Sequence, residues 1–220
     1  MIEFNFAVVL AQWPMLMRGL VLTVALTASS AALGALLGTA CAWARLHGGK
    51  ALKRAVGSYV ELVRNTPFII QLFFIFFGLP SLGLRLPVEL ACVLAMVLNL
   101  GAYACEIVRA GLQATPEGQL EAAMSLALTP RQTFFHVVLP PALARIWPAL
   151  VSQIIIVMLG SAVCGQISAE ELSQAANLIS SRTFRSFESY IVVTVAYVLL
   201  AIGLRQSLYW LGPRFIFASR

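Results

Sequence analysis

Long apolar stretches alternate with short polar ones along this chain. Five stretches carry no Asp, Glu, Lys or Arg, at residues 19–44, 65–84, 90–105, 146–169 and 189–204. A helix that crosses a bilayer needs about 20 mostly apolar residues. Three stretches reach that length directly, and the other two reach it when a flanking charged side chain extends toward the lipid headgroups. The pattern predicts an all-α membrane protein, a single domain over residues 1–220 with five transmembrane helices.

Composition and charge support the same class. Hydrophobic residues make up 60% of the chain and charged residues only 11%, against about a quarter charged in ordinary globular domains. The net charge of +6 does not indicate nucleic-acid binding, because the basic residues lie in the loops between the spans. One set of loops holds Arg45, Lys50, Lys53, Arg54, Arg64, Arg109, Arg131, Arg145, Arg205, Arg214 and Arg220, and the other set holds Arg18, Arg85, Arg182 and Arg185. Since cytoplasmic loops are the richer in Lys and Arg, we expect an outer (periplasmic) N-terminus and a cytoplasmic C-terminus.

Two segments near the start of the chain predict how the first spans pack. Ser30, Gly34, Gly38 and Ala42 recur every four residues, a spacing that lets two helix backbones approach closely. The stripe serves either packing within the subunit or contact with a second copy. Residues 51–64 show helical amphipathicity and are expected to lie along the cytoplasmic interface. There Asn65 or Thr66 is expected to cap the next helix, with Pro67 in its first turn.

Polar side chains inside the predicted spans are few. Asn99, Tyr103 and Glu106 fall on one helical face, and Arg109 lies three residues after Glu106, where the two can pair. Such groups are costly at membrane depth without a partner or water, so this face is either a polar clamp between helices or the lining of a hydrated path. The candidate pathway residues are Gln71, Asn99, Glu106, Gln153 and Ser161.

Residues 115–140, between the third and fourth spans, carry strong helix signals. Thr115-Pro116-Glu117 and, fourteen residues later, Thr129-Pro130 each predict a helix start. Gln132 stands where a capping box places it, and Pro140-Pro141 is expected to end the second helix. The apolar side chains of this cytoplasmic pair need cover, from another protein or from the subunit's own helices; they include Leu120, Leu126, Phe134 and Phe135.

The same segment resembles a known motif. Glu121-Ala122-Ala123 is followed at fixed spacings by Ala127, Val137 and Leu139-Pro140. This pattern is similar to the EAA loop of importer-type ABC-transporter permeases, which has Gly at the position of Ala127 and Ile at that of Val137. The replacement of Gly affects the turn between the two helices, and so the fit to a partner.

Further segments resemble the polar amino acid subfamily of these permeases, and together the resemblance covers residues 15–212. The matching segments are Arg64-Asn65-Thr66-Pro67, Gln71-Leu72, Phe76-Phe77-Gly78-Leu79-Pro80, Gly101-Ala102-Tyr103, Glu106-Ile107-Val108-Arg109-Ala110-Gly111 and Pro116-Glu117-Gly118-Gln119. Where that subfamily often has Lys-Asp-Thr-Ser in the fourth span, this chain has Met158-Leu159-Gly160-Ser161, so a binding role there does not carry over.

The resemblance implies a multi-pass permease of the bacterial inner membrane that takes up amino acids by alternating access. The loop would act as a coupling element in a groove of a cytoplasmic ATPase dimer, which binds the ATP and Mg²⁺; the permease itself would hold no cofactor. A second permease, the same or a sibling, and a periplasmic or extracellular amino-acid-binding protein complete the expected assembly in the lipid bilayer. The residues implied in ATPase coupling are Glu121, Ala122, Ala123, Ala127, Leu139 and Pro140.

The sequence also bears on two other classes of membrane protein. A membrane enzyme is disfavoured because the chain has no Asp, its two His lie in predicted loops, and its four Cys lack metal-binding spacing. Gly48-Gly49-Lys50 lacks the flanking residues of a P-loop. An ion-coupled transporter or channel needs titratable groups at the bilayer midplane. Only Glu106 comes close, and it lies toward a membrane edge.

Overall fold

The computed structural model describes residues 4–212 and 214, and every regular element within them is helical. The α-helices are α1 Phe6–Leu10, α2 Trp13–His47, α3 Lys50–Arg64, α4 Phe68–Phe73, α5 Val88–Gln113, α6 Glu117–Ser125, α7 Pro130–Thr133, α8 Leu139–Gly160, α9 Leu172–Thr183 and α10 Ser186–Leu211. Two π-helical segments occupy Phe74–Gly78 and Phe134–Val138, and two 3₁₀ segments occupy Leu79–Leu82 and Ser161–Ile167. The predicted all-α class is confirmed.

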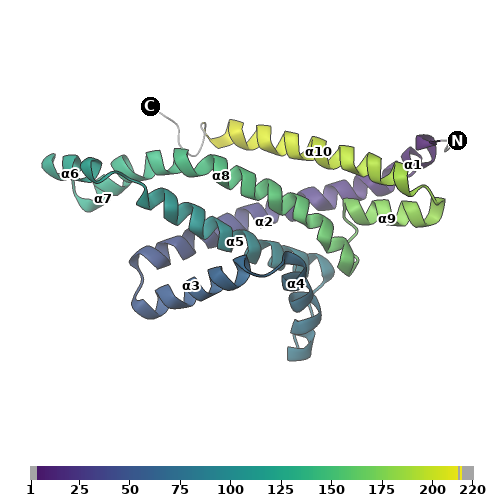
Figure 1. Cartoon of the computed structure of the whole chain (residues 1–220), viewed down its shortest axis with the longest axis horizontal. Helices are drawn as coiled ribbons and strands as arrows, with labels where there is room; N and C mark the ends of the chain where they lie inside the picture. Colours follow the sequence, from purple (N-terminus) through teal and green to yellow (C-terminus); the bar gives the residue numbers. More distant parts are fainter. Residues whose placement is uncertain (1–3, 213, 215–220) are drawn as a thin grey trace.

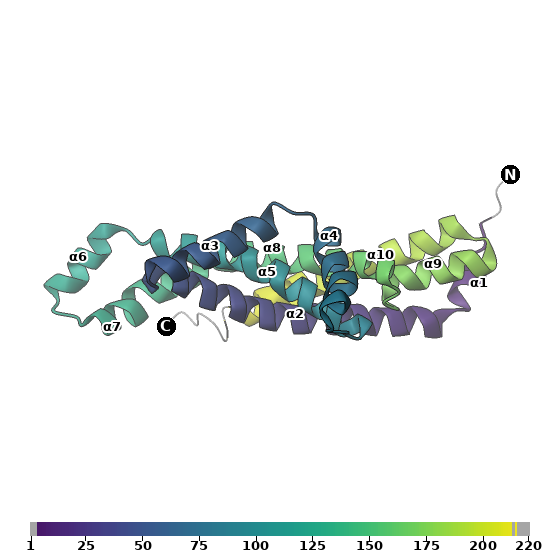
Figure 2. The same ribbon diagram turned by 90° about the horizontal axis from the view of Figure 1, so that it is seen from below.

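The long helices run along one axis of the molecule (Figure 1). Four helical stretches in the described part are long and apolar enough to cross a membrane: α2, Pro130–Ile167 (which contains α8), α5 and α10. The number rises to five only if α3 and the stretch after it form one broken span. α6 and α7 lie at one end of the bundle, and α1 and α9 at the other (Figures 1 and 2).

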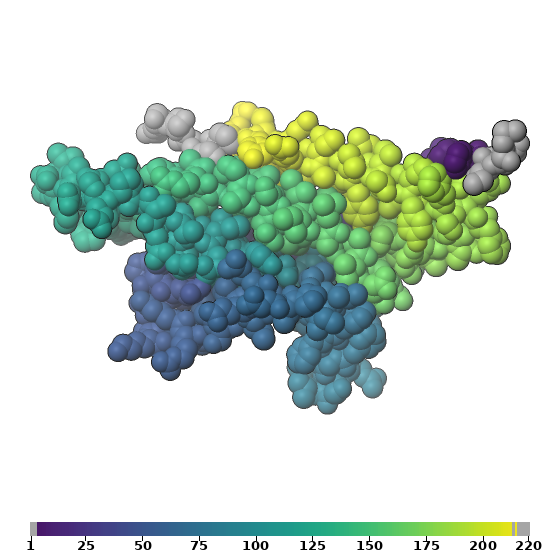
Figure 3. All heavy atoms as spheres, in the orientation of Figure 1, coloured from purple at the N-terminus to yellow at the C-terminus, as the bar shows by residue number. Residues whose placement is uncertain are grey.

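The second predicted span, 65–84, differs from the expectation. α3 and the helical stretch Phe68–Leu82 meet at 112°, and the latter projects sideways from the bundle (Figures 1 and 3). Pro67 has an extended backbone (φ −61°, ψ 140°) and is itself the N-cap of α4. Proline also disfavours the helical conformation at the residue before it, Thr66, so α3 does not continue into α4. The predicted cap by Asn65 or Thr66 is therefore wrong. Thr66 Oγ1 instead donates to Leu62 O in the helix before it, at 2.9 Å.

α3 does not lie across the end of the bundle. It runs back along α2 and α5, and buries Val60 and Val63 against Ala42, Ala102 and Cys105. The expectation that residues 51–64 lie along an interface is replaced by an antiparallel helix packed on two spans.

The small-residue stripe of α2 is used within the chain. Ser30, Gly34, Gly38 and Ala42 are all buried, and a Cβ placed on Gly34 would lie 2.8 Å from the Leu100 Cβ of α5. Small residues here let the two backbones come together. Of the two alternatives for the stripe, packing within the subunit is the one observed.

The connection between α8 and α10 is anchored by a buried carboxylate. Glu171 has no exposed surface and caps the start of α9. It accepts hydrogen bonds from the backbone N–H groups of Ser173 (2.9 Å) and Gln174 (2.7 Å) and from the Tyr197 hydroxyl of α10 (2.6 Å). The Leu172 N–H donates to Thr23 Oγ1 of α2 at 3.2 Å. These bonds satisfy a group that would otherwise be costly to bury, and tie α2, α9 and α10 together.

Candidate functional site

A helical hairpin made by α6 and α7 projects beyond the rest of the bundle (Figures 1 to 3). Its two legs continue into α5 and α8. The last carbonyls of a helix lack partners within that helix, and here Arg145 Nη1 of α8 donates to Ala114 O at the end of α5, at 2.8 Å. The base of the hairpin is thus bridged by a hydrogen bond between its two legs.

The turn between α6 and α7 depends on a left-handed residue. Ala127 has φ 53°. Its N–H donates to Met124 O at 2.9 Å, and the Leu128 N–H donates to Ala123 O at 3.1 Å. This pair of bonds is the Schellman motif, in which the left-handed position usually holds Gly. The position at which the EAA pattern has Gly is therefore the one that requires a positive φ, and Ala127 adopts it at a steric cost.

The helix signals of residues 115–140 have mixed outcomes. The capping box at Thr129 and Gln132 is confirmed. Thr115 does not cap α6, because Pro116 is the N-cap and the Thr115 hydroxyl donates back to Leu112 O at 3.2 Å. The prediction that Pro140-Pro141 ends the second helix is wrong: both lie in the first turn of α8. The π-helical turn before them shifts the hydrogen-bond register, and a first turn tolerates residues without an N–H.

The proposed coupling residues lie on two sides of the hairpin. Glu121 and Ala122 face outward, whereas Ala123 is buried. Leu139 is half-buried and Pro140 is exposed at the second leg. Of the apolar side chains expected to need cover, the hairpin partly covers Leu120 and Phe134. It leaves three large apolar side chains exposed, namely Met124 (66%), Leu126 (74%) and Phe135 (51%).

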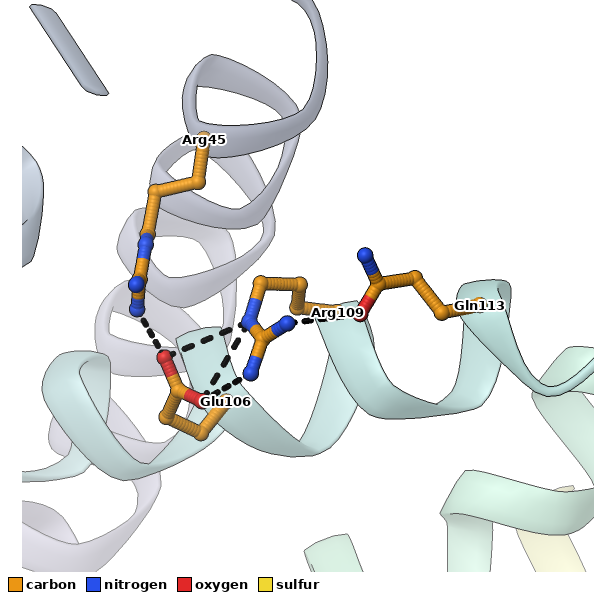
Figure 4. A network of polar contacts seen from close by, with 4 residues as sticks. All are labelled: Arg45, Glu106, Arg109 and Gln113. Atoms are coloured by element: carbon orange, nitrogen blue, oxygen red, sulfur yellow. Dashed lines mark hydrogen bonds and ion pairs between the residues drawn. The ribbon is translucent and has the colours of Figure 1, made fainter.

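Near the base of the hairpin, Glu106 joins α2 to α5 (Figure 4). Its carboxylate accepts from Arg109 Nη2 at 2.6 Å and forms an ion pair with Arg45 of α2. Arg109 Nη1 also donates to Gln113 Oε1 at 2.6 Å. The predicted Glu106–Arg109 pair is present, and the clamp between helices is the arrangement observed. Sequence reasoning missed Arg45, although it is the first charged residue after the apolar run 19–44.

Two predicted pathway residues meet at the bend between α3 and α4. Asn99 Nδ2 of α5 donates to Gln71 Oε1 of α4 at 3.1 Å. Gln71 Nε2 in turn donates to Val63 O at 2.7 Å and to Thr66 O at 3.0 Å, so this amide satisfies carbonyls that the end of α3 leaves open. Asn99 also lines a cavity of about 140 Å³ with Phe68 and Gly160.

The other three predicted pathway residues do not contact Gln71 or Asn99. Glu106 lies in the ion-pair network, and Ser161 is buried with its hydroxyl donating to Met158 O at 2.6 Å. Gln153 is half-buried on α8. Among the residues that the structure describes, no three His, Cys, Asp or Glu side chains gather closely enough to hold a metal ion.

Apolar helices of membrane-spanning length, with a bridged hairpin at one end of the bundle, define a helical membrane protein. Residues 34–217 match the family described as the binding-protein-dependent transport system inner membrane component, and the chain belongs to this family. Its members are transport subunits of the inner membrane rather than enzymes.

Individual relatives are similar over most of their length. The chain is 33% identical over 210 residues to the probable glutamine ABC transporter permease protein GlnM of Bacillus subtilis, covering 96% of this chain and 97% of that protein. It is 35% identical over 170 residues to the L-cystine transport system permease protein TcyB of the same organism, covering 77% and 73%. A chain in the crystal structure of an amino acid ABC transporter with histidines is 33% identical with a TM-score of 0.89, covering 97% of this chain and 100% of that one.

Proposed function

We propose that this chain is the permease subunit of an ATP-driven importer for amino acids or closely related small polar compounds. The relatives named for glutamine and cystine, and the solved amino acid transporter, support the substrate class. The family description supports delivery by a binding protein. In the membrane, α6 and α7 face the cytoplasm and α1 and α9 face the outer side, in keeping with the distribution of Lys and Arg.

The projecting hairpin is the observation that carries the coupling half of the proposal. Met124, Leu126 and Phe135 leave exposed apolar side chains on the hairpin, which projects beyond the bundle (Figure 3). Exposed apolar side chains gathered on a small element are typical of a protein contact. The hairpin docks in a groove of a cytoplasmic ATPase, with Glu121 and Ala122 facing the partner, and the ATPase holds the ATP and Mg²⁺.

Movement of the ATPase subunits reaches the spans through the base of the hairpin. α6 is joined to α5 and α7 to α8, and Arg145 bridges the two legs. Closure of the ATPase dimer therefore displaces α5 and α8 together and shifts the permease between inward-facing and outward-facing states. A second permease, the same or a sibling, supplies the other half of the path, and a binding protein delivers cargo on the outer face.

The pathway half of the proposal rests on Gln71 and Asn99. Their amides meet beside a cavity, and each retains hydrogen-bonding capacity beyond the bonds described. The roles of Glu106, Gln153 and Ser161 in the path remain predictions from the sequence.

Substitutions on α6 test the docking. The variants Glu121→Lys and Ala122→Trp are expected to lose most ATPase co-purification and ATP-driven uptake, because each changes the outward face of α6. Glu89→Lys is the matched control, since it makes the same charge reversal at an exposed position near the start of α5, away from the hairpin. Membrane insertion of all three is checked by their recovery in the washed membrane fraction, and folding in detergent by size-exclusion chromatography. Full ATPase recovery and uptake in both hairpin variants would rule out docking through this face.

A further inference from the structure

A charged cavity lies between the start of α2 and α9, at the end of the bundle opposite the hairpin (Figures 1 and 2). Its volume is about 440 Å³, which is within the range of small-molecule sites. Four polar side chains contribute to its lining, namely Gln12, Arg18, Glu170 and Arg182.

The three charged side chains around this cavity have no ionic partner in the described part of the chain. Arg18, Glu170 and Arg182 are all exposed, and none of them takes part in a salt bridge among the described residues. Two guanidinium groups and one carboxylate therefore line a shared space whose net charge is positive.

The directions of the two helices aim both arginines at the cavity. Leu172, at the start of α9, lies beside Gly19 of α2, and α9 runs from there toward the end of the bundle that holds α1 (Figures 1 and 2). α2 runs the opposite way. Since the Cα–Cβ bonds of a helix tilt toward its N-terminus, Arg18 leans outward along α2 and Arg182 leans inward along α9. The two guanidinium groups converge on the space between them.

The cavity lies at the headgroup level of the outer leaflet. The charge-free run of α2 begins at residue 19, directly after Arg18. Trp13, five residues before Arg18, is 63% exposed, and tryptophan is enriched at the membrane–water interface. Arg18 therefore lies at the edge of the hydrocarbon, where a long basic side chain reaches the lipid headgroups.

Inward from Arg18, the same side of α2 is apolar and open. Val21, Leu33 and Leu36 follow Arg18 by 3, 15 and 18 positions, which places them on one side of the helix. They are 64%, 50% and 68% exposed. From Arg18 to Leu36 this surface is about 27 Å long, which exceeds one leaflet of a hydrocarbon core about 30 Å thick. The cavity is thus continuous with a surface that an acyl chain can cover.

We infer that this cavity binds the headgroup of a zwitterionic phospholipid of the phosphatidylethanolamine class. Its phosphate accepts hydrogen bonds from Arg18 and Arg182, and its ammonium group donates to Glu170. Phosphatidylglycerol has the phosphate but no ammonium group, so it leaves Glu170 unpaired. The bound headgroup joins the start of α2 to α9. The inference rests on the proposed function, because the outer position of α1 and α9 comes from it.

A photoprobe in the cavity identifies its occupant. Gln12, which is exposed, is replaced by p-benzoylphenylalanine in the full chain. The chain is reconstituted with its ATPase and binding protein in vesicles of equal parts phosphatidylethanolamine and phosphatidylglycerol, and adducts are identified by mass spectrometry after irradiation. We expect about tenfold more phosphatidylethanolamine adduct than phosphatidylglycerol adduct. The matched control places the probe at Leu84, which is 60% exposed in the loop before α5. There the two adducts should be about equal.

Substitutions in the chain that carries the Gln12 probe assign the preference to the charged side chains. Glu170→Gln is expected to make the two adducts about equal, because the ammonium group loses its acceptor. Arg18→Gln and Arg182→Gln are each expected to lower both adducts about fivefold, because the phosphate loses a donor. Arg85→Gln and Glu89→Gln make the same charge changes at exposed side chains outside the cavity and should keep the tenfold preference. Size-exclusion chromatography checks that each variant is folded.

Three results would overturn the inference. Equal adducts from the Gln12 probe without further substitution would show an ordinary lipid-facing surface. Crosslinks to the binding protein or to a second permease in place of lipid would show a protein contact. A preference that survives Glu170→Gln would place the ammonium group elsewhere.

ATP-driven uptake, followed in the same vesicles, separates this inference from the proposed function. If uptake requires the ATPase but the lipid preference is absent, only the inference fails. If the preference is present and uptake proceeds without the ATPase, the proposed function fails instead.

Discussion

Replacing Ala127 by Gly is expected to stabilise the hairpin. Ala127 has φ 53° at the left-handed position of the turn between α6 and α7. The left-handed conformation costs a residue with a Cβ about 1–2 kcal/mol. Gly removes that cost but loses about 0.4–1 kcal/mol through the greater freedom of the open chain. The net gain is about 1 kcal/mol, which corresponds to about a fivefold change in the local opening equilibrium.

Hydrogen exchange at the turn measures this change. The Leu128 amide, bonded to Ala123 O at 3.1 Å, is expected to exchange about fivefold more slowly in Ala127→Gly, after correction for intrinsic rates. Mass spectrometry with fragmentation of the peptide covering residues 117–133 resolves it. Ala122→Gly is the matched control: Ala122 is exposed inside α6, where Gly costs about 0.8–1.0 kcal/mol. Exchange should therefore become faster. Unchanged or faster exchange in Ala127→Gly would refute the left-handed turn.

Three further changes test the packing and the polar anchors. Gly34→Leu is expected to abolish the folded protein in detergent, judged by size-exclusion chromatography, because a side chain there collides with Leu100. Glu171→Ala is expected to lower stability by about 2 kcal/mol, seen as a lower melting temperature, because it removes the cap of α9. Glu170→Ala, at the exposed residue next to it, is the control and should change the melting temperature little. Glu106→Gln is expected to cost about 1–2 kcal/mol in the same assay because two arginines lose their partner; an unchanged melting temperature would contradict the clamp.

The sequence predicted features that depend on local chemistry. The charge-free runs predicted four of the long helices, and the spacing between Thr129 and Gln132 was enough to predict the capping box. The Gly position of the EAA pattern coincided with a positive φ. In each case the physical cause lies within a few residues, so the pattern and the structure agree.

Other features depend on contacts between distant segments or on signals with two meanings. Proline is favoured both just after a helix and in the first turn of one, so Pro140-Pro141 predicted a helix end where the structure has a helix start. The charge-free run at 65–84 predicted the length of a helical segment but not the direction in which it runs, and the bend at Pro67 was not predicted. The Arg45–Glu106 pair and the burial of Glu171 arise from the packing of α2 against α5 and α9, which no local pattern reports.

Reconstituted uptake tests the central claim most directly. The chain is placed in proteoliposomes with its ATPase and binding protein, with ATP on the side of the hairpin, and uptake of radiolabelled amino acids is followed. Our account predicts uptake that requires ATP and the ATPase, and none from a proton or sodium gradient alone. Uptake driven by an ion gradient in proteoliposomes without the ATPase would contradict it and identify an ion-coupled transporter instead.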